Sequence, residues 1–347
     1  MKILIISPAW VGDMVMSQGL YISLKKLHVN VQIDVLAPAW CKAILDKMPE
    51  ISNAIEMPLG HGKFDLKTRY QLGKKLRSAH YDHAYILPNS AKSALIPFFA
   101  KIPVRTGWKG EMRYGLLNDL RPNKKKFQYM LERYIALAYP KSEMTGTGCM
   151  GDINTLPRPH LQIQKEQRDD VLQKFKLNLN TTIIGLCPGA EFGPSKRWPE
   201  QHYASVAKTL VEKDLQVWLF GSKKDRDITT LITRLIPANK QYLIKNLAGK
   251  TSLNEAVDLL SCCHTVVSND SGLMHVAAAV GCNLVAVYGS SSPRYTPPLT
   301  DNVAILQTGI SCQPCFKKEC SFKHLDCLNK LSPQVVLNAV QSFFIPI

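Results

Sequence analysis

The sequence predicts an α/β protein made of two Rossmann-like domains, each built on a parallel sheet that helices cover on both faces. Short apolar runs alternate with amphipathic helical stretches along the chain, which is the pattern of right-handed β–α–β crossovers. This rhythm weakens once, between about Thr145 and Pro159, where Gly, Thr and Pro accumulate as they do in linkers. A length of 347 residues is also long for one compact domain and sufficient for two.

The amino half begins with "KILIISPA" (residues 2–9), a run apolar enough to be a buried strand. Its further predicted elements are a helix at 16–28, a strand at 31–38, helices at 40–48 and 70–79, and a strand at 81–88. After the linker the pattern restarts, with helices at 165–177, 199–213, 225–236, 252–263 and 271–281, and strands at 181–189, 215–221, 242–249, 264–270 and 283–289. We therefore expect domains at 1–160 and 161–330, followed by a helix within 331–347.

The composition argues against several classes of protein. No apolar run approaches the roughly 18–20 residues of a membrane span, and the N-terminal run ends at Pro8 without a signal-peptide cleavage site, so we expect a cytosolic protein. An excess of 43 Lys and Arg over 27 Asp and Glu gives a net charge of +16, which suits a nucleic acid, an anionic membrane surface or a phosphorylated substrate. The basic segment 121–134 has too few regularly spaced aromatic residues for an RNA-binding sheet.

Ten cysteines in a chain without an export signal argue against a disulfide scaffold. Four of them, Cys312, Cys315, Cys320 and Cys327, follow the spacing C-x2-C-x4-C-x6-C. Four thiols this close in sequence can hold zinc or an iron–sulfur cluster, although the spacing differs from that of common zinc fingers and ferredoxins. A structural metal site, reduced thiols and a local disulfide all fit this pattern.

Ligands of open α/β sheets bind at the carboxyl ends of the strands, so functional residues are expected in the strand-to-helix turns and a ligand cleft between the two domains. The first such turn is "WVGDMVMS" (10–17). A dinucleotide-binding fingerprint needs three glycines and only Gly12 is present, which argues against a nicotinamide dehydrogenase. From the residues alone, Asp13 fits two roles: an acid that stabilises the helix start by about 0.5–2 kcal/mol, or a catalytic group.

Two turns of the carboxyl half favour anion binding. In "CPGAEFGPSKRWP" (187–199), Gly189 and Gly193 allow close approach of the backbone to a ligand, and Lys196 lies near a helix start, as in phosphate sites. In "SNDSGLMHVAAAVG" (268–281), a strand leads directly into a helix whose first amides belong to Ser271 and Gly272.

Two further side chains in these turns have open roles. His275 falls one turn into the predicted helix, on the same side as Ser271, and fits either packing or function. In "FGSKKDRD" (220–227), Asp225 either bonds a ribose or caps the following helix, and the Asp225–Asp227 pair is more typical of capping than of magnesium binding.

Six segments together resemble glycosyltransferase family 9, the bacterial heptosyltransferases. They occur in order from Met1 to about Pro298: "WVGDMVMS", "PLGHG", "LPNSAKSALIPF", "RTGWKGEMRYGLLND", "CPGAEFGPSKRWP" and "NDSGLMHVAAA". The resemblance implies the glycosyltransferase B architecture, in which two Rossmann-like domains face each other across a cleft. The amino half then receives the acceptor, the carboxyl half binds the sugar nucleotide, and the last helix crosses back onto the first domain.

The implied reaction moves L-glycero-D-manno-heptose from ADP-heptose to the first heptose of the lipopolysaccharide inner core, Hep-Kdo2-lipid A, with inversion. Asp13 resembles the general base of the family and Lys196 its phosphate-binding lysine. A cation and a helix start can stabilise the departing ADP, so no catalytic metal or cofactor is required. The implied donor-binding residues are Glu191, Phe192, Lys196, Asp225, Thr251, Asp270, Ser271, Gly272 and His275. The acceptor-binding residues inferred from the resemblance are Gly12, Lys92, Arg105, Lys109 and Arg113.

The partners implied are ADP-heptose, the lipid acceptor and the anionic surface of the inner membrane, at its cytoplasmic face, with no nucleic acid. Three alternatives stay open at this point: a member of the same family that uses an acceptor with no heptose or with two, a sugar-nucleotide epimerase, and a basic nucleic-acid-binding protein.

Overall fold

The computed structural model describes residues 1–60, 62–142 and 153–344. By its internal contacts the chain divides into two compact units, Met1–Leu161 and Gln162–Ile347. The sequence prediction put this boundary between residues 160 and 161. Much of the predicted linker, residues 145–152, lies outside the described residues, as do residues 345–347 of the predicted last helix.

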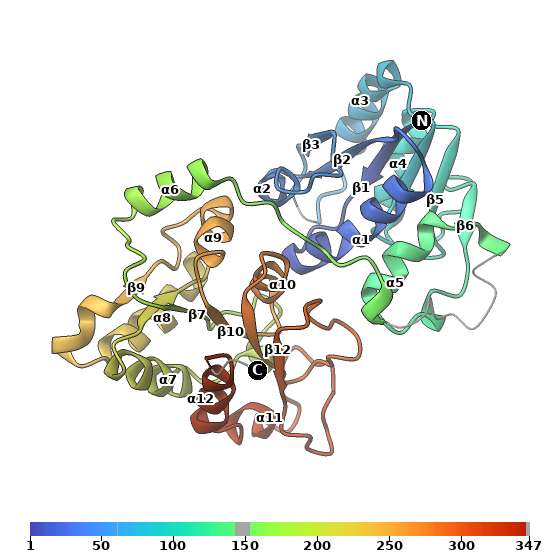
Figure 1. Cartoon of the computed structure of the whole chain (residues 1–347). Helices are drawn as coiled ribbons and strands as arrows, with labels where there is room; N and C mark the ends of the chain where they lie inside the picture. Colours follow the sequence, from blue (N-terminus) through green and yellow to red (C-terminus); the bar gives the residue numbers. More distant parts are fainter. Residues whose placement is uncertain (61, 143–152, 345–347) are drawn as a thin grey trace. The chain divides into compact units, whose positions relative to one another are not determined.

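The first unit is a parallel six-stranded sheet with the order β3-β2-β1-β4-β5-β6 (Figure 1). Its strands are β1 (Lys2–Ile6), β2 (Gln32–Pro38), β3 (Asn53–Met57), β4 (His83–Ile86), β5 (Val104–Trp108) and β6 (Asp119–Arg121). Its helices are α1 (Val11–Leu27), α2 (Lys42–Leu45), α3 (Leu66–Leu76), α4 (Ala91–Phe99) and α5 (Met130–Ile135). This strand order is that of doubly wound nucleotide-binding sheets, and it reverses between β1 and β4, where Ile3 pairs with His83.

The second unit repeats this topology, with the order β12-β11-β10-β7-β8-β9. Its strands are β7 (Ile183–Cys187), β8 (Gln216–Leu219), β9 (Ile244–Asn246), β10 (Thr265–Asn269), β11 (Asn283–Val287) and β12 (Val303–Leu306). Its helices are α6 (Lys165–Lys174), α7 (Glu200–Glu212), α8 (Arg226–Arg234), α9 (Leu253–Leu260), α10 (Gly272–Ala279), α11 (Asp326–Asn329) and α12 (Pro333–Ser342). The chain order reverses between β7 and β10, where Thr265 pairs with Ile184.

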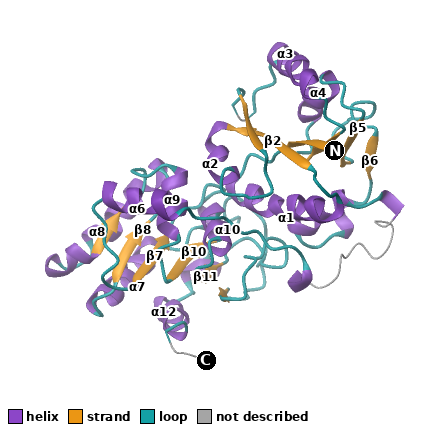
Figure 2. Ribbon diagram, turned by 45° about the horizontal axis from the view of Figure 1, so that its top comes forward, coloured by secondary structure: helices purple, strands orange, loops and turns teal. Residues whose placement is uncertain are grey.

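The central strands form because their residues can be buried on both sides. Helices flank each sheet (Figure 2), and β7, β10 and all but the first residue of β1 are buried. A strand buried on both faces needs a continuous apolar run rather than an alternating pattern, which "KILII" and "IIGLC" supply.

The sequence analysis missed several strands, and those at the sheet edges explain why. Strands β3 and β12 contain no buried residue, and β6 has three residues of which one is buried. An edge strand pairs on one side and packs against little, so its sequence carries no long apolar run.

The last helix, α12, packs within the second unit. It contacts α7, β10 and β11, and its buried residues Val336, Leu337 and Val340 belong to the same apolar core as Trp198 and Leu210. The resemblance implies that the last helix crosses back onto the first domain, and this stays a prediction.

Candidate active site

Each sheet has one switch point, where neighbouring strands send the chain in opposite directions and a crevice opens at their carboxyl ends. In the first unit the turns after β1 and β4 meet there, and in the second unit the turns after β7 and β10.

Asp13 lies in the first turn of α1, three residues after the N-cap residue Trp10, whose side chain makes no cap hydrogen bond. The hydroxyl of Tyr134, on α5, donates a hydrogen bond to Asp13 Oδ1 at 3.2 Å. Helices α1 and α5 pack closely together, so this contact fixes the carboxylate from outside its own helix. Asp13 is thus a half-buried acid in the first turn of α1, at the switch point of the first unit, where it can both stabilise the helix start and take part in catalysis.

A cation lies within electrostatic reach of this acid. Burial lowers the pKa of Lys124, the charge of Arg133 lowers it further, and the negative charge of Asp13 opposes both effects. Lys124 begins a short 3₁₀ turn, Lys124–Lys126. Sequence reasoning missed Lys124 and Tyr134, since both lie more than a hundred residues from Asp13 and only the tertiary fold brings them together.

Two of the predicted acceptor-binding residues bond to the first unit's own backbone, and their role toward the acceptor stays a prediction. Arg105 donates from Nε to Leu116 O at 2.7 Å and from Nη1 to Ile102 O at 2.6 Å. Arg113 is 1% exposed and donates to the carbonyl oxygens of Pro88, at 2.7 Å, and of Trp108. Through these hydrogen bonds both guanidinium groups stabilise the loops after β4 and β5.

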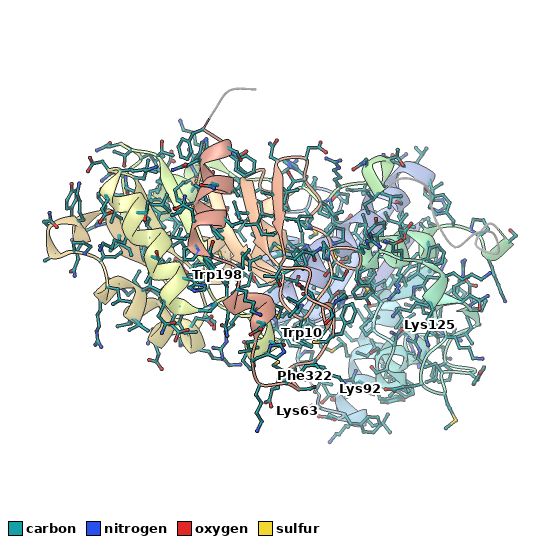
Figure 3. The ribbon with its side chains drawn as sticks, turned by 90° about the horizontal axis from the view of Figure 1, so that it is seen from below. Trp10, Lys63, Lys92, Lys125, Trp198 and Phe322 are labelled. Carbon is teal, nitrogen blue, oxygen red and sulfur yellow. The ribbon has the colours of Figure 1, made fainter. Side chains whose placement is uncertain are left out.

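The other predicted acceptor residues are closer to solvent. Lys109 is exposed and lies over the ring of Tyr114 at 5.9 Å, and Lys92 donates to Gly62 O at 2.8 Å. Gly12 is the second residue of α1. Figure 3 shows Lys92 on the first unit together with Lys63 and Lys125.

In the second unit the two predicted anion-binding turns meet. Lys196, in the turn after β7, forms an ion pair with Asp270, in the turn after β10, with 2.5 Å between Nζ and Oδ2. The side chain of Asp270 is 4% exposed and that of Lys196 is 18% exposed. The ring of Phe192 lies 5.0 Å from Lys196 Nζ and adds a cation–π contact. The pair presents an oriented cation at the switch point.

His275 is buried behind this pair, and burial lowers its pKa to about 4; the charge of Asp270 raises the pKa and that of Lys196 lowers it. The imidazole is therefore neutral at pH 7. Ser271 is the N-cap residue of α10 and makes no side-chain cap hydrogen bond, and Gly272 is the first helical residue. Their amides lie at the positive end of the helix, next to the ion pair.

The sequence analysis did not assign Asn269, although it immediately precedes Asp270. Its Oδ1 accepts hydrogen bonds from Trp198 N and from the Tyr203 hydroxyl, each at 3.1 Å, and its Nδ2 donates to Pro188 O at 2.8 Å. Trp198 is itself buried. Asn269 thus ties the turn after β7 to the turn after β10. An amide directly at a strand end is the signal that could have identified it.

The glycines of the turn after β7 serve the protein's own packing. A Cβ on Gly189 would lie 2.6 Å from the Asp225 carboxyl, and one on Gly193 would lie 2.6 Å from Lys318 O. Both positions therefore require glycine for the protein's own packing; that their backbone also approaches a ligand stays a prediction.

The weaker donor-site candidates have structural partners. Asp225 Oδ2 accepts hydrogen bonds from Ser222 N at 2.7 Å and from Ser222 Oγ at 2.8 Å, which completes a capping box on the short 3₁₀ turn Lys223–Asp225. Asp225 is the N-cap residue of α8, but its side chain makes no cap hydrogen bond to that helix. Glu191 pairs with Lys224 at the surface. Thr251 Oγ1 contacts Leu247 O at 3.5 Å. The bond from Asp225 to a ribose stays a prediction.

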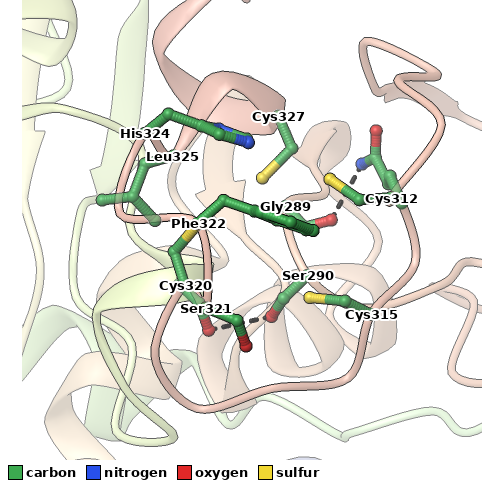
Figure 4. Close-up of a pocket in the computed structure, with 12 residues that line it drawn as sticks. Gly289, Ser290, Cys312, Cys315, Cys320, Ser321, Phe322, His324, Leu325 and Cys327 are labelled. Atoms are coloured by element: carbon green, nitrogen blue, oxygen red, sulfur yellow. Dashed lines mark hydrogen bonds between the residues drawn. The ribbon is translucent and has the colours of Figure 1, made fainter.

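The four clustered cysteines line one cavity, together with His324 and Phe322 (Figure 4). Backbone hydrogen bonds, from Leu325 above all, lower the pKa of Cys320. Burial raises the pKa of Cys327 to about 11, and the nearby Cys312, Cys315 and Cys320 raise it further. Within the described ranges, no group of three or more His, Cys, Asp or Glu side chains is arranged so that it could hold a metal ion.

Two doubly wound units of the same strand order, with a carboxylate at one switch point and a lysine–aspartate pair at the other, have the fold of glycosyltransferases of the B architecture. A sequence profile of glycosyltransferase family 9 (heptosyltransferase) matches residues 69–326. The chain belongs to this family.

Its relatives cover almost the whole chain. It is 54% identical to lipooligosaccharide heptosyltransferase 2 of Haemophilus influenzae over 88% of each protein, and 47% identical to lipopolysaccharide heptosyltransferase 2 of Escherichia coli over 99% of each. The solved structure of E. coli ADP-heptose lps heptosyltransferase II superposes with a TM-score of 0.88 at 46% identity, covering 99% of this chain and 98% of that one. None of the helices in the described part of the chain combines the length and the apolar character needed to cross a bilayer.

Proposed function

We propose that the chain has heptosyltransferase II activity: it transfers L-glycero-D-manno-heptose from ADP-heptose to the first heptose of Hep-Kdo2-lipid A. The observation that carries the donor half is the Lys196–Asp270 pair at the switch point of the second unit, beside the start of α10. The relatives named heptosyltransferase 2 support this choice of acceptor over acceptors with no heptose or with two.

Inversion at the anomeric carbon needs one base, which removes a proton from the acceptor hydroxyl as the glycosidic bond to ADP breaks. Asp13 is this base. Its carboxylate is half-buried, and one oxygen is oriented by the Tyr134 hydroxyl, so it is held in a defined position in the free enzyme.

The leaving ADP carries a growing negative charge. Lys196 and the amides of Ser271 and Gly272 stabilise this charge without a catalytic metal. When a diphosphate binds, its oxygens compete with Asp270 for the ammonium group of Lys196. Because Asp270 keeps the ammonium in place beforehand, little conformational entropy is lost on binding.

In this proposal the phosphates and carboxylates of the acceptor bind basic residues of the first unit. Lys92 and Lys109 have ammonium groups near solvent, and Lys124 lies close to Asp13. The net charge of +16 holds the enzyme at the anionic cytoplasmic face of the inner membrane.

The activity is tested with purified enzyme, ADP-heptose and three acceptors, which carry no heptose, one or two. Mass spectrometry of the lipid should show one added heptose on the one-heptose acceptor alone. Addition only to one of the other two acceptors would assign a different member of the family. Turnover of ADP-heptose without any acceptor would instead indicate an epimerase.

A further inference from the structure

Two neighbouring helices of the first unit carry a row of apolar side chains that solvent can reach. Helices α3 and α4 pack against each other (Figures 1 and 2). On α3, Leu66 and Tyr70 are exposed and lie four residues apart, so they are neighbours on one face of the helix. The ring of Tyr70 contacts that of Phe99 with 5.3 Å between centroids, and Phe99 contacts the exposed Phe98 at 5.7 Å. The row therefore continues from α3 onto α4.

The loop before α3 adds a further exposed ring, that of Phe64. This loop is held by Arg69, which is buried. Arg69 donates from Nε to Phe64 O at 2.8 Å, from Nη2 to Lys63 O at 3.0 Å and from Nη1 to Lys92 O at 3.0 Å. These hydrogen bonds tie the loop to the start of α4. An apolar ring is thus kept in solvent by a well-bonded backbone, which is unusual unless a partner covers it.

Basic side chains are interleaved with these apolar ones. Lys67 and Lys74 lie three residues before and four residues after Tyr70, on the same side of α3. The guanidinium group of Arg105 lies over the Phe98 ring at 5.6 Å. We name the α3–α4 surface by its exposed and half-buried members, which are Lys63, Phe64, Leu66, Lys67, Tyr70, Lys74, Phe98, Phe99, Lys101 and Arg105.

The positive charge of the chain is concentrated in the segment that contains this surface. Residues 62–105 have nine Lys and Arg and two Asp, a net charge of +7 out of +16 for the whole chain. One of the two acids, Asp65, uses its carboxylate to cap α3, accepting from Thr68 N at 3.0 Å and from Thr68 Oγ1 at 2.7 Å. Residues 162–347, more than half of the chain, carry only +5. The excess charge is therefore localised rather than spread evenly.

We propose that the α3–α4 surface binds an anionic lipid bilayer, with its apolar side chains among the headgroups and its lysines at the lipid phosphates. Aromatic and aliphatic side chains enter the boundary between headgroups and acyl chains, while Lys and Arg stems lie along apolar surface and keep their charges at the phosphates. A protein partner fits less well, because lysine is depleted at protein–protein interfaces and here lysines stand among the apolar side chains. The proposal rests on the proposed function, in which the acceptor is a lipid, and it assigns the membrane contact to a defined surface.

The surface extends to the edge of the sheet at which Asp13 lies. In a parallel sheet, each helix that follows a strand begins near the carboxyl ends of the strands. Phe64 lies two residues before α3, Lys92 is the second residue of α4, and Asp13 is in the first turn of α1. A bilayer bound to the α3–α4 surface therefore brings its headgroups to the same edge of the sheet as the proposed base.

The test measures co-sedimentation of the full-length protein with phosphatidylcholine vesicles, with and without added phosphatidylglycerol. We expect binding to the anionic vesicles, and weaker binding as salt screens the charges. Lys67→Gln combined with Lys74→Gln should weaken this binding about 10–30-fold, since each basic side chain near an anionic surface contributes about fivefold. Lys208→Gln combined with Lys213→Gln removes the same two charges from exposed positions of the second unit. This matched control should change the binding less than about twofold.

The apolar contribution is tested with Phe64→Ser, which should weaken the binding about 3–10-fold. The ring of Phe322, in the second unit, is 67% exposed against 59% for Phe64, so Phe322→Ser is the control and should bind like the wild type. All these variants should keep the wild-type rate of transfer to an acceptor freed of its acyl chains, because none of the changed residues belongs to the proposed active site.

A wild type that does not bind anionic vesicles would overturn the proposal. Equal losses in the two lysine pairs would also overturn it, since net charge alone would then explain the binding. Light scattering provides a further check: a dimer that Phe64→Ser dissociates would assign the surface to a second copy of the chain instead. Vesicle binding is measured without ADP-heptose or acceptor, so its failure and a failure of the heptosyltransferase assay are distinguishable.

Discussion

Asp270→Asn removes the negative partner of Lys196 and keeps the size of the side chain. Deleting one member of a fully buried ion pair costs about 3–5 kcal/mol, because the other charge stays behind uncompensated, whereas an exposed pair contributes about 0–1 kcal/mol. Asp270 is 4% exposed but 18% of the Lys196 side chain reaches solvent. Water therefore solvates part of the orphaned ammonium group, and we expect a loss of about 2–3 kcal/mol in the free energy of unfolding of the second unit.

The chain contains a matched control for this experiment. Lys240 and Asp214 also approach to 2.5 Å, but the Asp214 side chain is 70% exposed. Asp214→Asn should therefore cost less than about 0.5 kcal/mol. Urea unfolding, followed by the fluorescence of the buried Trp198 and Trp218 in the second unit, measures both variants. Equal losses in the two variants, or a loss below about 0.5 kcal/mol for Asp270→Asn, would refute the assignment of this pair as a buried, stabilising contact.

Three further outcomes are expected. Asp13→Asn should lower kcat by about 10²–10⁴-fold, while the affinity for ADP-heptose measured by calorimetry stays nearly unchanged. Near-normal turnover of this variant would rule out Asp13 as the base. Gly189→Ala places a Cβ 2.6 Å from the Asp225 carboxyl and should lower the free energy of unfolding in urea by about 1–3 kcal/mol. The loss should be smaller when Asp225→Ala is also present, because the clashing carboxyl is then absent. Simple additivity of the two changes would argue against this clash. The pKa of His275 is about 4 in the folded state and about 6.5 when unfolded, so its contribution to stability is present above pH 6.5 and declines by about 3 kcal/mol as the pH falls to 4. His275→Gln should flatten the stability–pH curve over this range, and an unchanged slope would contradict the burial argument.

The sequence predicts the central architecture well because burial on both faces of a parallel sheet leaves a direct signature. "KILII" and "IIGLC" are readable as strands, and the turns that follow them do contain Asp13 and Lys196. The edge strands β3 and β12 carry no such signature, since they bury almost nothing.

Some residues of the candidate sites could likewise be predicted from local sequence, and others could not. Residues adjacent to a strand end, such as Asp270, could be predicted from local sequence. The contacts that Arg113 and Asp225 make within the protein could not be predicted, because the sequence does not show which backbone groups the fold brings within reach of a charged side chain near a turn. The hydrogen bond from Tyr134 to Asp13 could not be predicted either, because the two residues are 121 positions apart in the sequence.

The repeated strand order has a consequence for how specificity evolves in this enzyme. Lys196, Asp270 and Asn269 are positioned by residues of the second unit, and Tyr134, which orients Asp13, belongs to the first. Each switch point is thus a self-contained module whose geometry is set by its own polypeptide. Under the proposed division of labour, acceptor choice and donor choice are separable traits. Replacing residues 1–161 by the corresponding part of a relative with another acceptor would redirect the heptose and leave the nucleotide-binding machinery as it is.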